Sequence, residues 1–231
     1  MINLPEIEGP SGIVFENLAT LKNRLGGFPK NDQNLIVKAY KAADKAHDGE
    51  LRISKERYFE HLRAVALILI DECHITDASL IAAAFLHDTL EDTTYFMDFE
   101  NRPFDRWQSI ARERIAHDFN DEVADIVLAV TIPKADRTGF ETDEQASAVY
   151  FNNLKLMLDN GNVKPIILKM ADRLHNLRTQ YYLSPERQKN KVKETRDKYL
   201  PLFEQAILLY PSGAYLSEQI KQELEKLEST F

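Results

Sequence analysis

Apolar residues recur at intervals of three or four positions through several long segments of this chain. The clearest stripe predicts a helix at about residues 57–73, because such spacing places side chains on one helix face. This stripe consists of Tyr58, Leu62, Val65 and Leu69. The same periodicity predicts further helices at about residues 15–24, 34–47, 77–90, 121–130, 142–159, 164–182, 185–209 and 214–227.

Residues that start or end helices separate these segments. Ser184 and Pro185 combine a hydroxyl cap with proline at the first helical position. Asn160-Gly161 is a typical helix end. Only eight glycines and nine prolines occur in 231 residues, too few for a sandwich with many turns. We therefore predict an all-α fold, with an N-terminal extension at residues 1–33 and one helical domain at 34–231.

Composition narrows the functional classes. Hydrophobic residues make up 44% of the chain, which is enough for a substantial core, and the longest apolar runs are too short to span a membrane. The net charge of −8 and the lack of a long basic run argue against binding to a nucleic acid polymer. A single cysteine and the lack of a signal-like start favour a cytoplasmic protein.

Two histidines stand close to apolar helix faces. His61 lies four positions before Val65, at the edge of its stripe, where a core histidine bonded to a carbonyl is the simpler interpretation. His87 and Asp88 follow the apolar run at residues 81–86. Burying an adjacent imidazole and carboxylate costs free energy unless both find partners, and a metal ion would satisfy both.

An adjacent His-Asp pair is a weak signal by itself. His117-Asp118 is a second such pair, in a charged stretch that we interpret as irregular and exposed. We predict that His117-Asp118 is a surface pair.

Two further acids, Glu91 and Asp92, follow His87 and Asp88 by one helical turn. Carboxylates close to a metal site are suited to general-base work on water. A solvated helix end is the alternative, although acids are disfavoured at the negative end of the helix dipole.

The predicted helix at residues 164–182 carries a polar stripe. Lys169, Asp172, Asn176 and Thr179 fall on one face of that helix, opposite its apolar residues. A cation, an acid, an amide and a hydroxyl in a row suit a ligand-binding wall, but an ordinary solvated face fits equally well.

Taken together, two histidines and two aspartates offer nitrogen and oxygen ligands without a thiolate. Such a set suits a six-coordinate Mn²⁺, Fe²⁺ or Mg²⁺ site better than a closed structural zinc site.

The order His61, His87-Asp88, Asp172 resembles the HD phosphohydrolase superfamily. The amino-acid sequences of four segments resemble a narrower group, the hydrolase domain of RelA/SpoT proteins. These segments are residues 47–54, 58–61, 82–93 and 169–179. The likeness extends over roughly residues 34–205.

This resemblance implies a single HD-domain helical bundle that holds manganese through His61, His87, Asp88 and Asp172. It implies that Glu91 and Asp92 position or deprotonate the attacking water. It also implies that Arg52 contacts the guanine of a nucleotide. The rest of the nucleotide pocket would be lined by Ser54, Lys169, Asn176 and Thr179. The implied reaction removes pyrophosphate from the 3′ position of guanosine tetra- or pentaphosphate, leaving GDP or GTP.

Two positions depart from the family pattern. Leu62 stands where a proline usually follows the first metal histidine, and Ile53 stands where a basic residue commonly follows the pocket arginine. Because the charge at residue 53 is lost, phosphate binding or nucleotide preference can differ.

Two alternatives therefore stay open beside the guanosine nucleotide. One is the same chemistry on an adenosine alarmone or a phosphorylated nicotinamide cofactor. The other is a regulatory partner that binds a nucleotide or neutralises a toxin without turnover. The sequence leaves the oligomeric state open.

Overall fold

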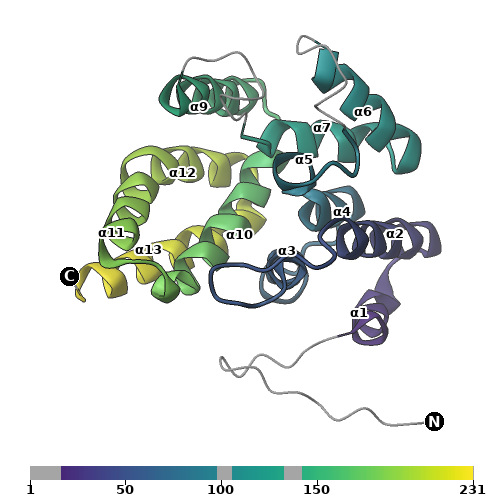
Figure 1. The fold of residues 1–231 in the computed structure, drawn as a ribbon, viewed down its shortest axis with the longest axis horizontal. Helices are drawn as coiled ribbons and strands as arrows, with labels where there is room; N and C mark the ends of the chain where they lie inside the picture. Colours follow the sequence, from purple (N-terminus) through teal and green to yellow (C-terminus); the bar gives the residue numbers. More distant parts are fainter. Residues whose placement is uncertain (1–16, 98–105, 133–141, 231) are drawn as a thin grey trace.

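The computed structural model describes residues 17–97, 106–132 and 142–230, which form helices joined by turns and loops (Figure 1). Within these ranges, the only strand-like pairing is an isolated antiparallel bridge between Leu51 and Arg57. The prediction of an all-α fold is thus confirmed. In the same ranges, no helix has the length and apolar character needed to cross a membrane.

The described part of the chain consists of helices of different lengths. The first seven are α1 (Leu18–Arg24), α2 (Lys30–Ala46), α3 (Tyr58–Leu67), α4 (Ala78–Leu86), α5 (Thr89–Asp92), α6 (Trp107–Asp118) and α7 (Asp121–Val130). The later ones are α9 (Asp143–Asp159), α10 (Lys164–Arg178), α11 (Pro185–Glu194), α12 (Leu200–Leu209) and α13 (Ala214–Glu228). Short turns of helix extend several of them. These are η1 (Leu25–Gly27), η2 (Ile68–Glu72), η4 (Gln180–Tyr182), η5 (Thr195–Tyr199) and η6 (Pro211–Gly213).

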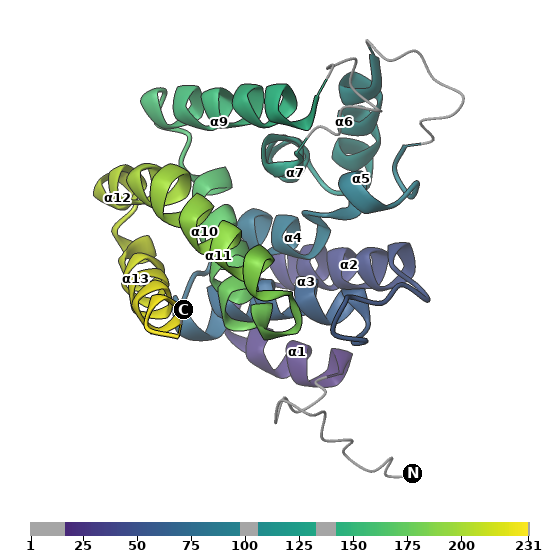
Figure 2. The same cartoon turned by 60° about the vertical axis from the view of Figure 1, so that its left-hand side comes forward.

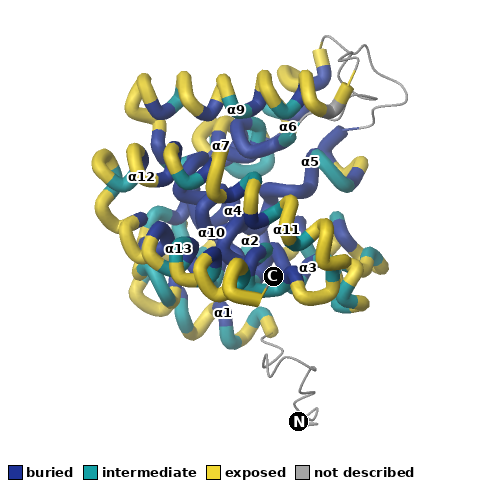
Figure 3. The backbone as a smooth tube through the Cα atoms, turned by 90° about the vertical axis from the view of Figure 1, so that its left-hand side faces the viewer, coloured by how far each residue is buried: buried dark blue, intermediate teal, exposed yellow. Residues whose placement is uncertain are grey.

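Helix α4 lies at the centre of the molecule. All nine of its residues are buried, and none of them is charged. It packs against α2, α3 and α7, and Figure 3 shows it among the buried segments, with exposed helix faces outside. A helix that is apolar on every side is stable in water only when its neighbours cover it completely.

Helix α10 is the second central element, and it joins the two parts of the bundle. It contacts α3, α4 and α7 on one side and α12 and α13 on the other (Figure 2). The helix is buried from Pro165 to His175, although this stretch includes Lys169, Asp172 and Arg173. Because buried charges are costly unless they are paired, these side chains require partners inside the fold.

Helix starts agree with the capping residues in the sequence. The Asp77 carboxylate accepts the backbone N–H of Leu80 at 3.0 Å at the start of α4. The Thr142 hydroxyl accepts that of Gln145 at the start of α9. At the end of α9, Gly161 has a φ of 77°, which favours glycine.

The prediction that the stretch around His117 is irregular is wrong, because this stretch forms helix α6. Trp107, Ala111 and Ile115 are spaced by four and buried, but the charged residues between them obscured the period. The prediction of a surface pair is confirmed, since the His117 side chain is 88% exposed and lies 3.4 Å from Asp118.

Two predicted helices are interrupted in the structure. The helix expected at 77–90 breaks after Leu86, where the Thr89 hydroxyl donates to the Leu86 carbonyl at 2.6 Å. The helix expected at 185–209 widens at η5, just before Pro201. Proline lacks an N–H and its ring crowds the preceding turn, and a wider turn relieves both problems.

The N-terminal residues of the described part belong to the packed bundle. Helix α1 contacts α2, and Leu21 and Leu25 are buried in the core. Phe15 and Glu16, at the start of the helix expected there, lie outside the described residues. The proposed division at residue 33 stays a prediction.

Candidate metal centre and adjoining pocket

Three central helices bring the predicted metal ligands together. His61 comes from α3, His87 and Asp88 follow α4, and Asp172 comes from α10. One ligand atom from each of His61, His87 and Asp172 lies within 4.8 Å of the other two. His61 Nε2 is 3.2 Å from Asp172 Oδ1, and His87 Nε2 is 3.8 Å from the same oxygen.

Asp88 closes this cluster from the side of α5. Its Oδ1 lies 3.2 Å from His87 Nε2, and its Oδ2 lies 3.6 Å from His61 Nε2. All four side chains are buried. Two imidazole nitrogens and two carboxylates thus face a common centre.

The hydrogen bonding of His87 fits a metal ligand. Its Nδ1 lies 2.8 Å from the carbonyl oxygen of Ala84, which can only accept, so Nδ1 carries the hydrogen. The Nε2 atom is buried and has no hydrogen-bond partner among the described residues. Burial lowers the pKa of His87, but Asp88 and Asp172 outweigh it and raise that pKa to about 10. The two carboxylates therefore favour positive charge at this position.

His61 is oriented by a histidine that the sequence reasoning missed. Its Nδ1 lies 2.8 Å from Nδ1 of His175, one turn after Asp172 on α10. Burial lowers the pKa of His175 well below its usual range, so the ring is neutral and one nitrogen accepts. When His61 donates its Nδ1 hydrogen to His175, its Nε2 is left free to bind a metal ion. The signal available in the sequence was the spacing of His175 from Asp172.

Tyr58 connects the cluster to the carboxylates of α5. Its hydroxyl lies 2.9 Å from Asp88 Oδ2 and 2.8 Å from Asp92 Oδ2. The Tyr58 ring stacks on His47 with centroids 4.8 Å apart. Asp92 is thereby held beside the cluster rather than in a solvated helix end.

Glu91 is half-buried beside the cluster. Its Oε1 accepts the backbone N–H of Ile132 at 2.7 Å. Burial, together with the charge of Asp88, raises the pKa of Glu91 to about 8. A carboxyl group with such a pKa can take up or release a proton near neutral pH.

The polar stripe of α10 is not a solvated face. Lys169 and Asp172 are buried, and Lys169 Nζ lies 2.9 Å from Asp172 Oδ2. The Asn176 side-chain amide donates to the other oxygen of Asp172 at 2.6 Å, and Arg52 donates to the Asn176 side-chain oxygen, Oδ1, at 2.8 Å. These bonds fix the Asp172 carboxylate and link it to Arg52.

Comparison with known proteins agrees with this geometry. Residues 39–206 match the family model described as HD domain, and this span contains all four cluster residues. The chain belongs to the HD-domain family.

Individual relatives of this HD domain carry longer chains. It is 34% identical over 185 residues to the guanosine-3′,5′-bis(diphosphate) 3′-pyrophosphohydrolase of Haemophilus influenzae, covering 80% of this chain and 23% of that protein. This chain is also 34% identical over 177 residues to a probable GTP pyrophosphokinase of Mycobacterium leprae, and the match covers 76% of this chain and 19% of that protein. A probable guanosine-3′,5′-bis(diphosphate) 3′-pyrophosphohydrolase from Synechocystis is 36% identical over 168 residues, and the match covers 73% of this chain and 20% of that protein. The chain thus spans 19–23% of the length of these relatives.

A solved structure shares the fold. It is described as a metazoan ortholog of SpoT that hydrolyzes ppGpp and plays a role in starvation responses. The TM-score is 0.59 at 22% identity, and the match covers 87% of this chain and 98% of the other.

A pocket of about 310 Å³ adjoins the cluster of the HD domain. That volume lies at the lower end of the range for small-molecule sites, roughly 300–1,000 Å³. Four residues expected at a nucleotide line it: Arg52, Ser54, Asn176 and Thr179. The remaining lining residues are Leu51, Ile53, Tyr58, Gln180, Tyr182, Leu183 and Lys191.

Lys169 is absent from this lining, and Lys191 is an addition that the sequence reasoning missed. Lys191 comes from α11, a strongly charged helix in which one lysine does not stand out. The lining contains two cationic side chains and no carboxylate. The pocket therefore suits an anionic ligand, although the whole chain is acidic.

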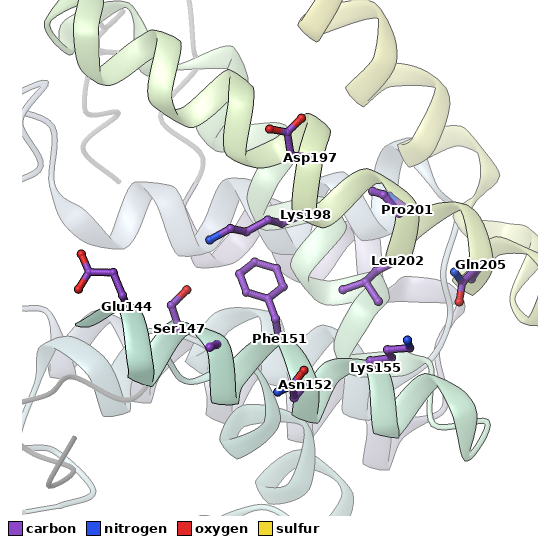
Figure 4. A pocket seen from close by; sticks show the side chains of 11 residues that line it. Glu144, Ser147, Phe151, Asn152, Lys155, Asp197, Lys198, Pro201, Leu202 and Gln205 are labelled. Atoms are coloured by element: carbon purple, nitrogen blue, oxygen red, sulfur yellow. The ribbon is translucent and has the colours of Figure 1, made fainter. Parts of the chain in front are cut away.

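A larger hollow, of about 670 Å³, lies between α9 and the η5–α12 segment (Figure 4). Figure 4 shows Phe151 between these two elements, with Lys198 beside it, and the Lys198 Nζ lies 5.3 Å from the ring centroid. Its lining has two lysines balanced by Glu144 and Asp197 and includes no cluster residue. It is therefore separate from the candidate metal centre.

Proposed function

We propose that this HD domain hydrolyses the 3′-pyrophosphate of guanosine tetra- or pentaphosphate, giving GDP or GTP and pyrophosphate. The observation that carries the proposal is the buried cluster of His61, His87, Asp88 and Asp172, with the acids of α5 and an electropositive pocket beside it. The named activity of the Haemophilus and Synechocystis relatives supports this choice of substrate.

His61, His87, Asp88 and Asp172 would hold the metal ion, with Mn²⁺ as the first candidate and Fe²⁺ or Mg²⁺ as alternatives. The donor set and the unsatisfied Nε2 of His87 support binding of such an ion. When bound, the ion supplies neutralisation of phosphate charge and activation of water.

Glu91 and Asp92 are the proposed acid–base residues. The raised pKa of Glu91 suits proton transfer near neutral pH, and Tyr58 holds Asp92 next to Asp88. In the reaction, water adds to the phosphorus next to the ribose and gives up a proton to a carboxylate. The bond from that phosphorus to the 3′ oxygen breaks, and the oxygen takes up a proton.

Arg52 is the proposed contact for the guanine ring. Its guanidinium group lies 2.8 Å from Asn176 Oδ1 and 3.5 Å from His175 Nδ1, and these contacts orient it. A planar cation held in this way can stack on a purine. Ser54, Asn176 and Thr179 would line the remainder of the pocket, whereas Lys169 would act by holding Asp172.

Turnover of guanosine tetraphosphate by the purified protein, with and without Mn²⁺, tests this proposal. We expect metal-dependent release of pyrophosphate, and we expect its loss in Asp172→Ala. If no pyrophosphate is released although calorimetry detects bound metal, guanosine tetraphosphate is not the substrate.

Ile53 motivates a second candidate. It is 60% exposed at the pocket and contributes no charge there, so an adenosine alarmone or a phosphorylated nicotinamide cofactor is the alternative substrate. Competition among these nucleotides decides between them, and a clear preference for guanosine tetraphosphate excludes the alternative.

A binding role without turnover is the remaining hypothesis, either for a nucleotide or for neutralising a toxin. An Asp88→Ala variant separates the two roles. If the variant keeps the full biological effect of the parent protein, binding rather than hydrolysis is the function.

A further inference from the structure

Lys191 differs from the other deeply placed lysines of this protein. Lys169 pairs with Asp172, and Lys164 pairs with Asp77 at 2.5 Å. Lys191 is half-buried, but its side-chain ammonium group makes no hydrogen bond or ion pair with any residue in the described ranges. An ammonium group withdrawn from water without a partner costs free energy, which a ligand can recover.

The surroundings of Lys191 point to an anion. Its side chain lines the same pocket as Arg52, and no carboxylate belongs to that lining. Ile53, on the loop before α3, lines the pocket too and brings no charge. The positive charge of the pocket therefore comes from Arg52 and from Lys191, on two different elements.

The pKa of Lys191 is consistent with an anionic ligand beside it. Burial lowers the pKa of Lys191 to about 8, and the charges of Arg173 and Arg52 act in the same direction, whereas the carboxylates of Asp172 and Glu194 oppose the shift. A phosphate group beside the ammonium would offset both effects, because an opposite charge favours the charged form.

The place of Lys191 decides which phosphate it meets. None of the four cluster residues lines the pocket, while Tyr58 and Asn176 line it and bond to Asp88 and Asp172. The pocket is thus next to the cluster, not at its centre. If the reacting phosphate lies at the cluster, as the proposed function requires, Lys191 faces the phosphate on the other side of the nucleoside.

We propose that Lys191 binds the non-reacting 5′-phosphate group of the substrate and selects nucleotides that carry phosphates on both sides of the ribose. This inference rests on the proposed function. It makes Lys191 a specificity-determining residue, with no part in bond breaking.

The test is direct calorimetry in a Glu91→Gln background with Mn²⁺ present, where the nucleotide is not consumed. The probes are guanosine tetraphosphate and its form with a single 5′-phosphate. Lys191→Met is expected to weaken binding of the tetraphosphate by roughly tenfold, which is the effect of losing a charge-assisted hydrogen bond. The same change should weaken binding of the form with a single 5′-phosphate less. Lys191→Arg is expected to keep most of the affinity.

Lys193→Met is the matched control, since Lys193 lies two positions away on the same helix and is exposed. It should bind both nucleotides as its parent does. Circular dichroism and thermal melting check that each variant is folded. In the Lys191→Met background, adding Ile53→Lys should restore part of the lost affinity.

Three results would overturn the inference: unchanged affinity in folded Lys191→Met, equal losses for both nucleotides, or no binding by the Glu91→Gln parent. Turnover by the protein with Glu91 intact is measured separately. Binding without turnover would contradict the proposed function and leave the role of Lys191 to be judged by calorimetry.

Discussion

His175 Nδ1 lies within reach of two donors that belong to different parts of the site. His61 Nδ1 is 2.8 Å away, on the side of the metal cluster, and Arg52 Nη1 is 3.5 Å away, on the side of the pocket. A neutral imidazole nitrogen offers one lone pair, so the shorter contact is the stronger one. At the residue scale, His175 is therefore a positioning residue for His61.

Replacing His175 by phenylalanine should weaken Mn²⁺ binding by roughly 10- to 100-fold, the usual effect of losing a partner of a metal-bound histidine. Calorimetric titration of the protein with Mn²⁺ measures the loss. His175→Gln keeps an acceptor for the His61 hydrogen and should retain more affinity. Equal losses in the two variants would show that the packing of the ring matters and the hydrogen bond does not.

Cys73 is the one cysteine of the chain, and its environment predicts low reactivity. Burial raises the pKa of the thiol to about 12, and the thiolate is the reactive form. At pH 8, alkylation by iodoacetamide should be at least about a hundredfold slower in the folded protein than in denaturant, because the denatured thiol regains an ordinary pKa near 8.5. Mass spectrometry follows the reaction, and similar rates in both states would contradict the burial of this thiol.

At the scale of elements, a residue that caps the start of a helix can also contact a neighbouring helix. Asn120 caps α7 by accepting the Val123 N–H at 2.8 Å, and it also donates to the Ser79 hydroxyl of α4 at 3.2 Å. Ser184 caps α11 through a longer contact of 3.4 Å and faces solvent. The two caps have the same local role but different connections to the core.

Asn120→Ala should therefore lower the free energy of unfolding by about 1–2 kcal/mol, and Ser184→Ala by about 0.5 kcal/mol. Urea denaturation measures both values. If Ser184→Ala proved the more damaging change, the contact between Asn120 and Ser79 would have no stabilising effect.

On the scale of the whole molecule, the candidate metal centre joins three helices that are far apart in sequence. An ion held by His61, His87 and Asp172 would connect α3, α4 and α10 in the folded state alone. A ligand that binds only the folded state stabilises it by mass action.

Mn²⁺ at a hundred times its dissociation constant should add about 2.7 kcal/mol of stability. For a chain of this size, that corresponds to a rise in Tm of roughly 5–10 °C. Differential scanning calorimetry with Mn²⁺, and then with excess EDTA, measures the shift. Asp172→Asn should abolish it, whereas Asp121→Asn, at a side chain that is 78% exposed, should keep it. A shift that persists in Asp172→Asn would place the ion elsewhere.

The sequence by itself determined the helical class, because periodic apolar residues, caps such as Asp77 and the scarcity of breakers are local features. It failed where local features conflict, as in α6, whose apolar spacing is hidden among charges. It also could not foresee the break after Leu86, since the contacts that stabilise His87 and Asp88 there come from α3 and α10.

Only the tertiary structure decided which chemistry-bearing residues meet. Spacing along α10 left a solvated face and a ligand wall equally plausible, and burial of Lys169 and Asp172 excluded the solvated face. The spacing of His175 from Asp172 was a weak local signal, and Lys191 carried none, because the partners that define their roles are more than a hundred positions away, such as His61 and Arg52. Periodicity acts within one helix, whereas the distance between ligand atoms depends on how helices pack, and for that reason the site emerged only with the fold.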